Sequence, residues 1–418
     1  MKKKTNDQFT LFDRRKFIKF FGLSSAMLTT GLDVLYSGGI KAQEWVAGMT
    51  KDLTWKPVAL PIPRLTDGLT PDEQIEFYSE YEAQDDLILP EGFTYNVIAS
   101  WGDPVGDCRY GYNNDHIGFV ESGENQAYLV VNHENMDYDS LATYLETFPM
   151  VMGYALPDVL NKIKDNVILD FSEMNDEDPK KEMIKSIALE GAADMGISVI
   201  SVERNNNGDW VRTFSEQDRR ISVTQALKDP AKLSKSTGPA SSVFRKQNKI
   251  GFDDGLLDKC IGSFWNCSGG TTPWGTVISA EEWLDAHVIY PVKADGSSFP
   301  PTTMPFYTST FSGLGNIFEL AGNKYGWGVE VDPENKDDFG TKHTMLGRYR
   351  HEAFSFNCKK NQPLAVYAGD DTKGGHIYKM ISDGKVSDPK SKSNSKLLEA
   401  GVLHAAKFSK DGKGYWIP

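Results

Sequence analysis

The feature of this 418-residue chain that most constrains its fold is a long series of short alternating runs separated by Gly, Asp and Asn. Stretches such as "GENQAYLVVNHEN", "GTVISAEEW" and "PLAVYAGDD" alternate apolar and polar residues between turn residues, as half-buried strands do. The 38 glycines, 17 tyrosines and 9 tryptophans are typical of a turn-rich β protein. We therefore predict a mainly β fold. No strict repeat distinguishes a propeller from another large antiparallel architecture.

A few helices are expected between the strands. The stretch "TPDEQIEFYSEYEAQ" predicts a short helix capped by Thr70, with Pro71 in its first turn. Helical spacing of apolar residues also predicts helices around 154–164 and 178–190. The last residues, "FSKDGKGYWIP", resemble a hairpin whose second strand has just begun, so we expect an incomplete sheet at the C-terminus.

The N-terminus has the pattern of an export signal. Arg14 and Arg15, followed by "KFIKFF" and small residues, match the twin-arginine pattern, which a receptor reads as an address. The alternative is a basic tail on a cytoplasmic protein. We interpret residues 1–42 as a signal peptide cleaved after Ala42 and residues 43–418 as the mature domain. This predicts a periplasmic or secreted protein, with the twin-arginine export machinery as a partner. The apolar run is too short to leave a stable membrane span after cleavage.

The acidic balance of the chain limits its partners. The formal net charge is −13, and removal of the basic residues 1–42 leaves the remainder more acidic still. Such a surface repels nucleic acid, and no basic patch suggests otherwise. Converging carboxylates instead attract divalent cations. Twin-arginine export carries folded proteins, often with a metal already loaded, which also points to a metal site.

One stretch, "NCSGGTTPWGTVISAEEW", combines a thiol with two adjacent glutamates. A thiolate selects transition metals, whereas carboxylates suit iron or calcium, so a site with both favours iron or mixed metals. Because "WGTVISAEE" is predicted as a strand, only one of Glu281 and Glu282 can face the side of Cys267, and we prefer Glu281. The alternatives are a buried apolar Cys267 or disulfides among the four cysteines, for example Cys260 with Cys267.

Other candidate ligands stand at the edges of strand-like runs. Asn132 and Glu134 follow "AYLVV", although a plain polar turn would also explain them. In "GRYRHEAF", an anion could lie between the guanidinium of Arg348 or Arg350 and a metal held by Glu352; a surface strand with compensating charges is the alternative. Two weaker candidates, each also explained as a turn, are "YAGDDTKGGHIYKM" and "RYGYNNDHIGF".

Taken in order behind the export signal, "RYGYNNDHIGF", "YLVVNHEN", "NCSGGTTPWGTVISAEE", "GRYRHEAF" and "YAGDDTKGGHIYKM" make the chain resemble the PhoX-type alkaline phosphatases. The resemblance extends from the leader to the last residue, and "CSGGTTPWGT" is its most specific part. It implies a β-propeller with helical insertions. Members of the family are typically longer, so the chain is interpreted as an N-terminal fragment or a shortened member.

The resemblance also implies an activity and a set of roles. The activity is hydrolysis of phosphorylated small molecules at a cluster of iron (Fe3+) and calcium. Cys267 would be the iron-ligating thiolate, with Glu352 and one of Glu281 and Glu282 as further ligands. The phosphate contact would be Arg350 or Arg348, and this contact would give the arginine a catalytic role. Asn132 and Glu134 would be calcium ligands or would support them.

Two other functions remain open at this point. One is a different metal-dependent propeller hydrolase, such as a phosphotriesterase or lactonase. The other is a non-catalytic, calcium-bound propeller that serves as a binding module.

Overall fold

The computed structural model describes residues 68–80, 86–136, 168–307, 312–410 and 413–418. The chain divides into two compact units, Met1–Asn96 and Val97–Pro418. The predicted signal peptide, its boundary after Ala42 and the predicted helix around 154–164 lie outside the described residues. Among the helices that are described, none combines the length and the apolar character needed to cross a membrane.

The described part of the first unit contains helix α3, Pro71–Glu80. Its start is stabilised by a reciprocal pair of hydrogen bonds. The backbone N–H of Glu73 donates to Thr70 Oγ1 at 3.3 Å, and the backbone N–H of Thr70 donates to the Glu73 carboxylate at 2.7 Å. This capping box satisfies two amide donors that the helix itself leaves unpaired. The predicted capped helix is confirmed.

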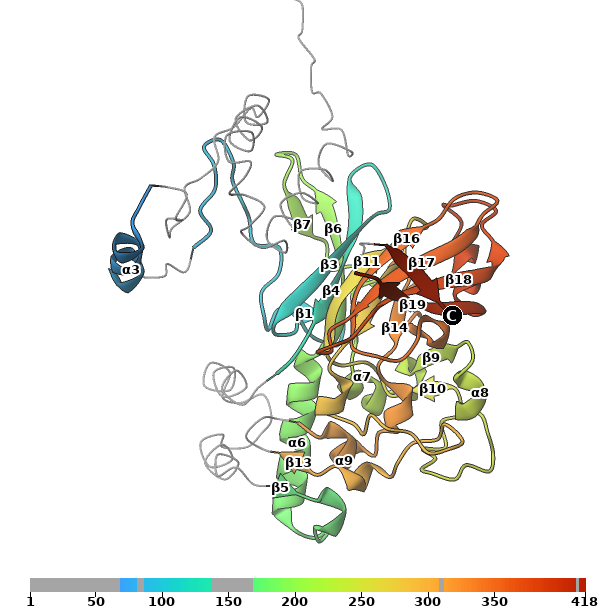
Figure 1. The fold of residues 1–418 in the computed structure, drawn as a ribbon. Helices are drawn as coiled ribbons and strands as arrows, with labels where there is room; N and C mark the ends of the chain where they lie inside the picture. Colours follow the sequence, from blue (N-terminus) through green and yellow to red (C-terminus); the bar gives the residue numbers. More distant parts are fainter. Residues whose placement is uncertain (1–67, 81–85, 137–167, 308–311, 411–412) are drawn as a thin grey trace, which may run out of the picture. The chain divides into compact units, whose positions relative to one another are not determined.

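The second unit is built mainly from antiparallel strands (Figure 1). Its first sheet has the order β3-β4-β6-β7, with β8 also paired to β6. Its strands are β3 Asn114–Glu121, β4 Gln126–His133, β6 Gly196–Arg204, β7 Trp210–Arg212 and β8 Arg219–Ile221. The second sheet has the order β10-β9-β15-β14-β12-β11. Its strands are β9 Ser234–Thr237, β10 Lys259–Cys260, β11 Asn266–Thr271, β12 Val277–Glu281, β14 Gly328–Val331 and β15 Thr341–His343.

The third sheet is a meander in which each strand pairs with the next along the chain. Its strands are β16 His351–Asn357, β17 Pro363–Asp370, β18 Ile377–Lys385, β19 Gly401–Phe408 and β20 Gly414–Ile417. Two further pairs complete the described strands: β1 Pro104–Val105 with β2 Cys108–Arg109, and β5 Ile168–Leu169 with β13 Phe306–Tyr307.

The second sheet lies between the other two, and two apolar cores join them. One core packs Val130 and Ile197 of the first sheet against Val277 and Val329 of the second. The other packs Ile278 and Ala280 of the second sheet against buried residues of the third, including Phe354, Leu364 and Val366. The edge strand β11 contacts both β3 and β16, so one edge strand from each sheet meets at a common line. Figure 1 shows these strands side by side.

Helices gather at one end of the sheets (Figure 1). The longest described helix is α6, Pro179–Asp194, and the Asp178 carboxylate accepts a hydrogen bond from the Lys180 amide at 2.9 Å at its start. Ile187 of α6 packs in a core with Phe264 and Tyr325. The shorter helices there are α7 Val223–Lys228, α8 Ser241–Phe244 and α9 Leu314–Phe318. The helix predicted around 178–190 is confirmed.

The mainly β prediction is confirmed, and each quoted strand-like stretch contains a described strand. The described sheets do not close into a ring, so the propeller stays a prediction. One pairing departs from the expected antiparallel pattern, because β9 and β15 run parallel. All four cysteines are free, so the structure contains none of the disulfides that the cysteine count left open.

Candidate metal centre

The line where β3, β11 and β16 meet brings together six side chains that carry metal-ligand atoms. We call them the acidic cluster. Its members are Asp115 of β3, Glu134 directly after β4, Cys267 of β11, Glu282 directly after β12, Glu352 of β16 and Asp371 directly after β17. Each of the three sheets thus contributes one residue from its edge strand and one from the end of the neighbouring strand.

A β-bulge stands at the same place in all three edge strands. Strand pairing shifts register between Asn114 and Ile117 in β3, between Asn266 and Gly269 in β11, and between His351 and Phe354 in β16. Asp115, Cys267 and Glu352 lie within these three shifts. A bulge inserts an extra residue and turns its side chain away from the regular alternation, and bulges are common beside functional sites.

The adjacent glycines of β11 allow the three edge strands to approach one another. A Cβ atom added to Gly270 would lie 2.2 Å from the backbone oxygen of Phe354 in β16. One added to Gly269 would lie 2.7 Å from the His116 ring, which belongs to β3. No side chain fits at those distances, so the Gly-Gly pair beside Cys267 is required by packing on both of its neighbours.

Cys267 lies at the centre of the acidic cluster. Its Sγ is 3.0 Å from Asp115 Oδ2 and 3.8 Å and 3.9 Å from the two carboxylate oxygens of Glu352. Burial, the hydrogen bond to Asp115 and the surrounding negative charges raise the pKa of the Cys267 thiol far above its usual range. Without a cation the thiol therefore keeps its proton, and a bound metal ion would reverse that preference.

The glutamates of the cluster repel one another. Burial, followed by the charges of Glu352, Glu134 and Asp371, raises the pKa of Glu282 to about 7. The pKa values of Glu134 and Glu352 are also raised, first by burial and then by nearby acids. Ligand atoms of Glu134, Cys267 and Glu282 lie within 4.8 Å of one another, as do those of Glu282, Glu352 and Asp371. Glu282 belongs to both groups.

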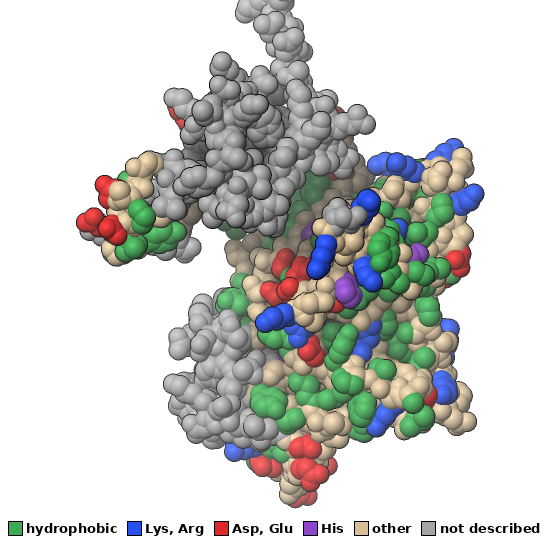
Figure 2. Space-filling view, viewed as in Figure 1, with side chains coloured by type: hydrophobic (Ala, Val, Ile, Leu, Met, Phe, Trp, Pro, Cys, Tyr) green, Lys and Arg blue, Asp and Glu red, His purple; other side chains and the backbone are tan. Residues whose placement is uncertain are grey.

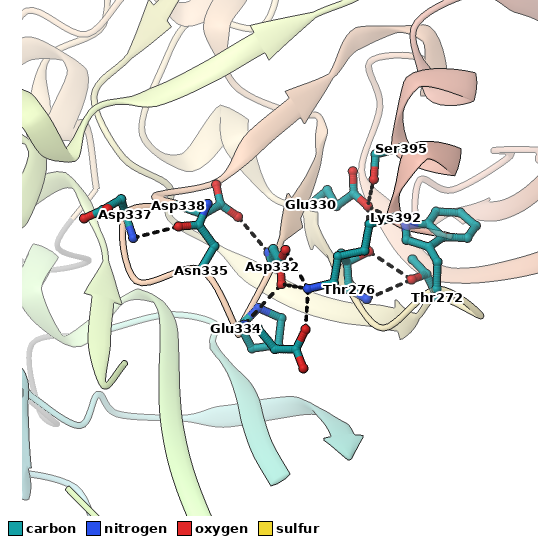
Figure 3. A network of polar contacts seen from close by, with 12 residues as sticks. Thr272, Thr276, Glu330, Asp332, Glu334, Asn335, Asp337, Asp338, Lys392 and Ser395 are labelled. Atoms are coloured by element: carbon teal, nitrogen blue, oxygen red, sulfur yellow. Dashed lines mark hydrogen bonds and ion pairs between the residues drawn. The ribbon is translucent and has the colours of Figure 1, made fainter. Parts of the chain in front are cut away.

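A second group of carboxylates, away from the acidic cluster, is neutralised by a lysine of the chain itself. Asp332 and Glu334 lie around the Lys392 ammonium, which is 2.6 Å and 2.8 Å from the two Asp332 oxygens and 2.5 Å from Glu334 (Figure 3). The acidic cluster contains no comparable ion pair among the described residues. In Figure 2, acidic side chains gather near the middle of the visible face, with basic ones beside them.

The residues present therefore fit bound cations. Five carboxylates and a thiol converge, and the raised pKa values of Cys267 and of the three glutamates indicate that the negative charge lacks compensation from the chain. The site opens to solvent on one side. Cys267 and Glu282 are buried, whereas Asp115 and Asp371 are exposed. Beside Cys267, the buried Oδ1 of Asn132 has no hydrogen-bond partner within the described part of the chain. A thiolate with carboxylates suits iron, and oxygen ligands alone suit calcium.

The two adjacent glutamates have different surroundings, and our preference for Glu281 is corrected. The Glu281 carboxylate is buried away from the cluster and forms an ion pair with Lys342 at 2.6 Å. It also accepts hydrogen bonds from Ser263 Oγ and from the backbone N–H groups of Gly326 and Trp327. Its accepting capacity is used within the protein. Glu282 is the member of the pair that lies with Cys267, as strand alternation required of one of them.

The two arginines also differ, and Arg348 does not suit the proposed phosphate contact. Its partly buried guanidinium donates to the backbone carbonyls of Tyr325 and Gly322, each at 2.8 Å, and to that of Tyr290. Burial lowers the pKa of Arg348 to about 10. Since each of its nitrogen atoms already donates to a carbonyl, Arg348 holds loops together. Arg350 is partly exposed and lies near Glu282, whose charge contributes to raising the Arg350 pKa.

Asn132 supports Cys267 from the neighbouring strand. Its side-chain NH2 group donates to the backbone carbonyls of Cys267 at 2.6 Å and Ser268 at 2.8 Å. Both contacts fix the backbone that carries the thiol. Glu134 accepts a hydrogen bond from Asn113 Nδ2 at 3.0 Å, which orients its carboxylate. Asn132 is thus placed to support the cluster, whereas Glu134 belongs to it.

Asp115 and Asp371 are the members of the cluster that the sequence indicated only as weak candidates and that were not assigned as ligands. Both belong to stretches that were noted as weak candidates, "RYGYNNDHIGF" and "YAGDDTKGGHIYKM". Their position directly beside a strand end was the available signal. Within the second stretch, Lys379 lies away from the cluster, with its ammonium 4.3 Å from the centroid of the Trp416 ring.

A cavity of about 910 Å³ lies elsewhere, lined by Thr237, Glu330 and His343 among others, and contains no residue of the acidic cluster. His343 joins Glu330 at 2.7 Å and Thr237 at 3.0 Å. Glu330 also accepts hydrogen bonds from Thr276, Trp274 and Ser395, so this network is satisfied within the chain. The acidic cluster, whose charges are not neutralised within the described residues, is therefore the better candidate for a functional site than this cavity.

Comparison with known proteins agrees with the geometry. The family model "Alkaline phosphatase PhoX" matches residues 77–418. Among solved structures, Pseudomonas fluorescens PhoX in complex with vanadate, a transition state analogue, is similar to this chain, with a TM-score of 0.57 and 24% sequence identity. The match covers 79% of this chain and 56% of that chain, so this chain spans little more than half of that PhoX. The likeness concerns the fold. No curated protein matches.

Proposed function

We propose that this chain, which belongs to the PhoX alkaline phosphatase family, hydrolyses phosphate monoesters at the acidic cluster. The observation that carries the proposal is the convergence of Cys267 with five carboxylates from three sheets, beside the partly exposed Arg350. Such a cluster can hold several cations, and a phosphate group needs positive charge around its oxygens.

We propose iron and calcium as the metals. Cys267, with Asp115 and Glu352 beside it, would hold iron (Fe3+), because this is the part of the cluster that offers a thiolate. Glu282, Glu352 and Asp371 form a group that supplies only oxygen atoms and would hold calcium, with Glu134 close to Glu282. When bound, these ions neutralise the charge of a phosphoryl group and acidify water.

The chain's own residues have separate roles in this proposal. The guanidinium of Arg350 binds the substrate phosphate, because it lies near Glu282 and its Nη1 makes no hydrogen bond to any described residue. Asn132 holds the backbone of Cys267 in place. Lys342 and Glu281 form the buried pair that fixes the end of β12, from which Glu282 extends.

We also propose that the protein is exported through residues 1–42 and acts in the periplasm or outside the cell. The support is the Arg14-Arg15 pattern in the sequence. A twin-lysine substitution of these two residues should retain the protein in the cytoplasm, as cell fractionation would show.

The central test measures metal content, visible absorption and p-nitrophenyl phosphate hydrolysis without added zinc, in wild type and Cys267→Ala. We expect iron, colour and hydrolysis to be lost together in the variant. The matched control is Cys358→Ala, because Cys358 is also a free thiol but lies outside the acidic cluster. Retained iron in Cys267→Ala would refute the assignment of the thiolate.

The same preparation distinguishes the alternatives. A colourless protein that binds calcium and hydrolyses nothing would support a binding module. Turnover of a phosphotriester or a lactone, without turnover of the monoester, would support another hydrolase.

A further inference from the structure

Arg350 is held by a carboxylate that is not part of the acidic cluster. Its Nε and Nη2 donate to the two oxygens of Asp285, at 3.2 Å and 2.8 Å. Its Nη1 makes no hydrogen bond to any residue that the structure describes. A guanidinium has more than one edge of N–H donors. Asp285 occupies the Nε–Nη2 edge and leaves the Nη1 side available to an anion.

The flat face of the Arg350 guanidinium is also held, by an aromatic ring. The Arg350 guanidinium carbon is 5.0 Å from the centroid of the Trp283 ring, a cation–π contact. Trp283 is itself anchored by an edge-to-face contact with Trp265, with ring centroids 5.1 Å apart. Trp283 follows Glu282 directly in the chain, Asp285 comes two residues after Trp283, and Arg350 precedes Glu352 by two residues. The segment 282–285 therefore supplies Glu282 of the cluster and the two residues that hold Arg350, and the segment 350–352 supplies Arg350 and Glu352.

One carboxylate of the acidic cluster, that of Glu282, competes with Asp285 for Arg350. After Asp285, the charges of Glu282 and Asp370 act on Arg350 most strongly. An arginine released from Asp285 would gain by pairing with Glu282, because that carboxylate has no ion-pair partner within the described residues. Such a pair would consume both a metal ligand and the phosphate contact.

We propose that Asp285 is a positioning residue, which holds Arg350 at the edge of the acidic cluster with one side free for a phosphate oxygen and prevents it from pairing with Glu282. This inference rests on the proposed function. It names a residue that acts through Arg350 and does not itself touch substrate. Trp283 limits the guanidinium to one plane, and Asp285 fixes its rotation within that plane.

The test compares Asp285→Asn with wild type by calorimetric titration of inorganic phosphate into the metal-loaded protein, and by KM and kcat for p-nitrophenyl phosphate. We expect phosphate affinity to fall about tenfold and KM to rise by a similar factor, because the aligned charge-assisted contact is lost. Asp285→Glu should recover part of the affinity. The matched control is Asp258→Asn, which removes the partner of Arg245 in another exposed ion pair and should change neither value.

A double-mutant cycle decides whether Asp285 acts through Arg350. If it does, Asp285→Asn combined with Arg350→Ala should bind phosphate no more weakly than Arg350→Ala alone. Additive losses, or an unchanged phosphate affinity in Asp285→Asn, would overturn the inference while leaving the phosphatase proposal intact. Absence of phosphate binding and of hydrolysis in the metal-loaded wild type would overturn both. Thermal unfolding of each variant checks that it is folded.

Discussion

Removing the charge of Glu281 should lower the stability of the protein, whereas removing the charge of Glu282 should lower its metal content. Glu281→Gln leaves the Lys342 ammonium, which is fully buried, beside a neutral amide. The amide also has only one oxygen for the four donors that the carboxylate now serves, so at least one donor loses its acceptor. These donors are Ser263 Oγ, Lys342 Nζ and the backbone N–H groups of Gly326 and Trp327.

The magnitude follows from the burial of this pair. Removing one partner of a buried ion pair costs roughly 3–5 kcal/mol, because the other charge stays buried without compensation. A domain is typically stable by about 5–15 kcal/mol, so Glu281→Gln should lose a large part of that stability. Glu282→Gln should leave the stability of the metal-free protein within about 1 kcal/mol of wild type or raise it, since the substitution relieves repulsion among buried acids. Its metal content should fall.

Two measurements on each variant test this reasoning. Urea unfolding in the presence of a chelator gives the free energy of unfolding, and elemental analysis of the loaded protein gives iron and calcium per chain. Glu281→Gln should unfold at a much lower urea concentration, and whatever remains folded should still bind metal. If Glu281→Gln unfolds like wild type but loses metal, then Glu281 is a ligand and our assignment of the pair is wrong.

Two further predictions concern the same site. Since the pKa of Glu282 is raised from 4.5 to about 7, the folded metal-free protein holds this proton more tightly than the unfolded chain. That stabilisation is complete below about pH 4.5 and is lost as pH rises through about 7. Thermal unfolding in chelator from pH 5 to 8 should show this decline. The decline should be smaller in Glu282→Gln, and smaller in wild type when calcium replaces the chelator. Gly270→Ala should destabilise the protein by about 2–4 kcal/mol and lower its metal content, because the new methyl group would collide with the backbone of Phe354. An unfolding midpoint within error of wild type would refute the packing role of Gly270.

Strand-level features of the chain could be predicted because they are encoded locally. Alternation in "PLAVYAGDD" predicts β17, whose burial does alternate along the strand. "GTVISAEEW" forms β12 as predicted, but every residue of β12 is buried, so the expectation of a half-buried strand is wrong there. The Thr70 and Asp178 caps fix the starts of α3 and α6. The arrangement of the sheets is not encoded in this way. The parallel pairing of β9 with β15 joins residues about a hundred positions apart, and no local pattern indicates it.

The same limit applies to the two arginines. In a regular strand, Arg348 and Arg350 would face the same side, so the sequence gives no reason to prefer one of them. The backbone there is not a strand: Gly347 has a φ of 92°, and β16 begins only at His351. This break sends Arg348 into a pocket of backbone carbonyls and leaves Arg350 beside Asp285.

The three bulges explain why the cluster could be predicted only in part. A ligand set built within one segment has a characteristic spacing, whereas this one joins Asp115, Cys267 and Glu352 across more than two hundred residues. Each residue lies in a register shift of a different edge strand, and these strands share no sequence repeat. The three edge strands share only their position, since each lies close to another at the line where they meet, and the Gly269-Gly270 pair permits this close approach. The close contact of the sheets creates the charge repulsion at Glu282, which either a proton or a bound cation would relieve. The Cys-Ser-Gly-Gly stretch therefore serves the proposed metal site twice, through the thiol it supplies and through the packing it allows.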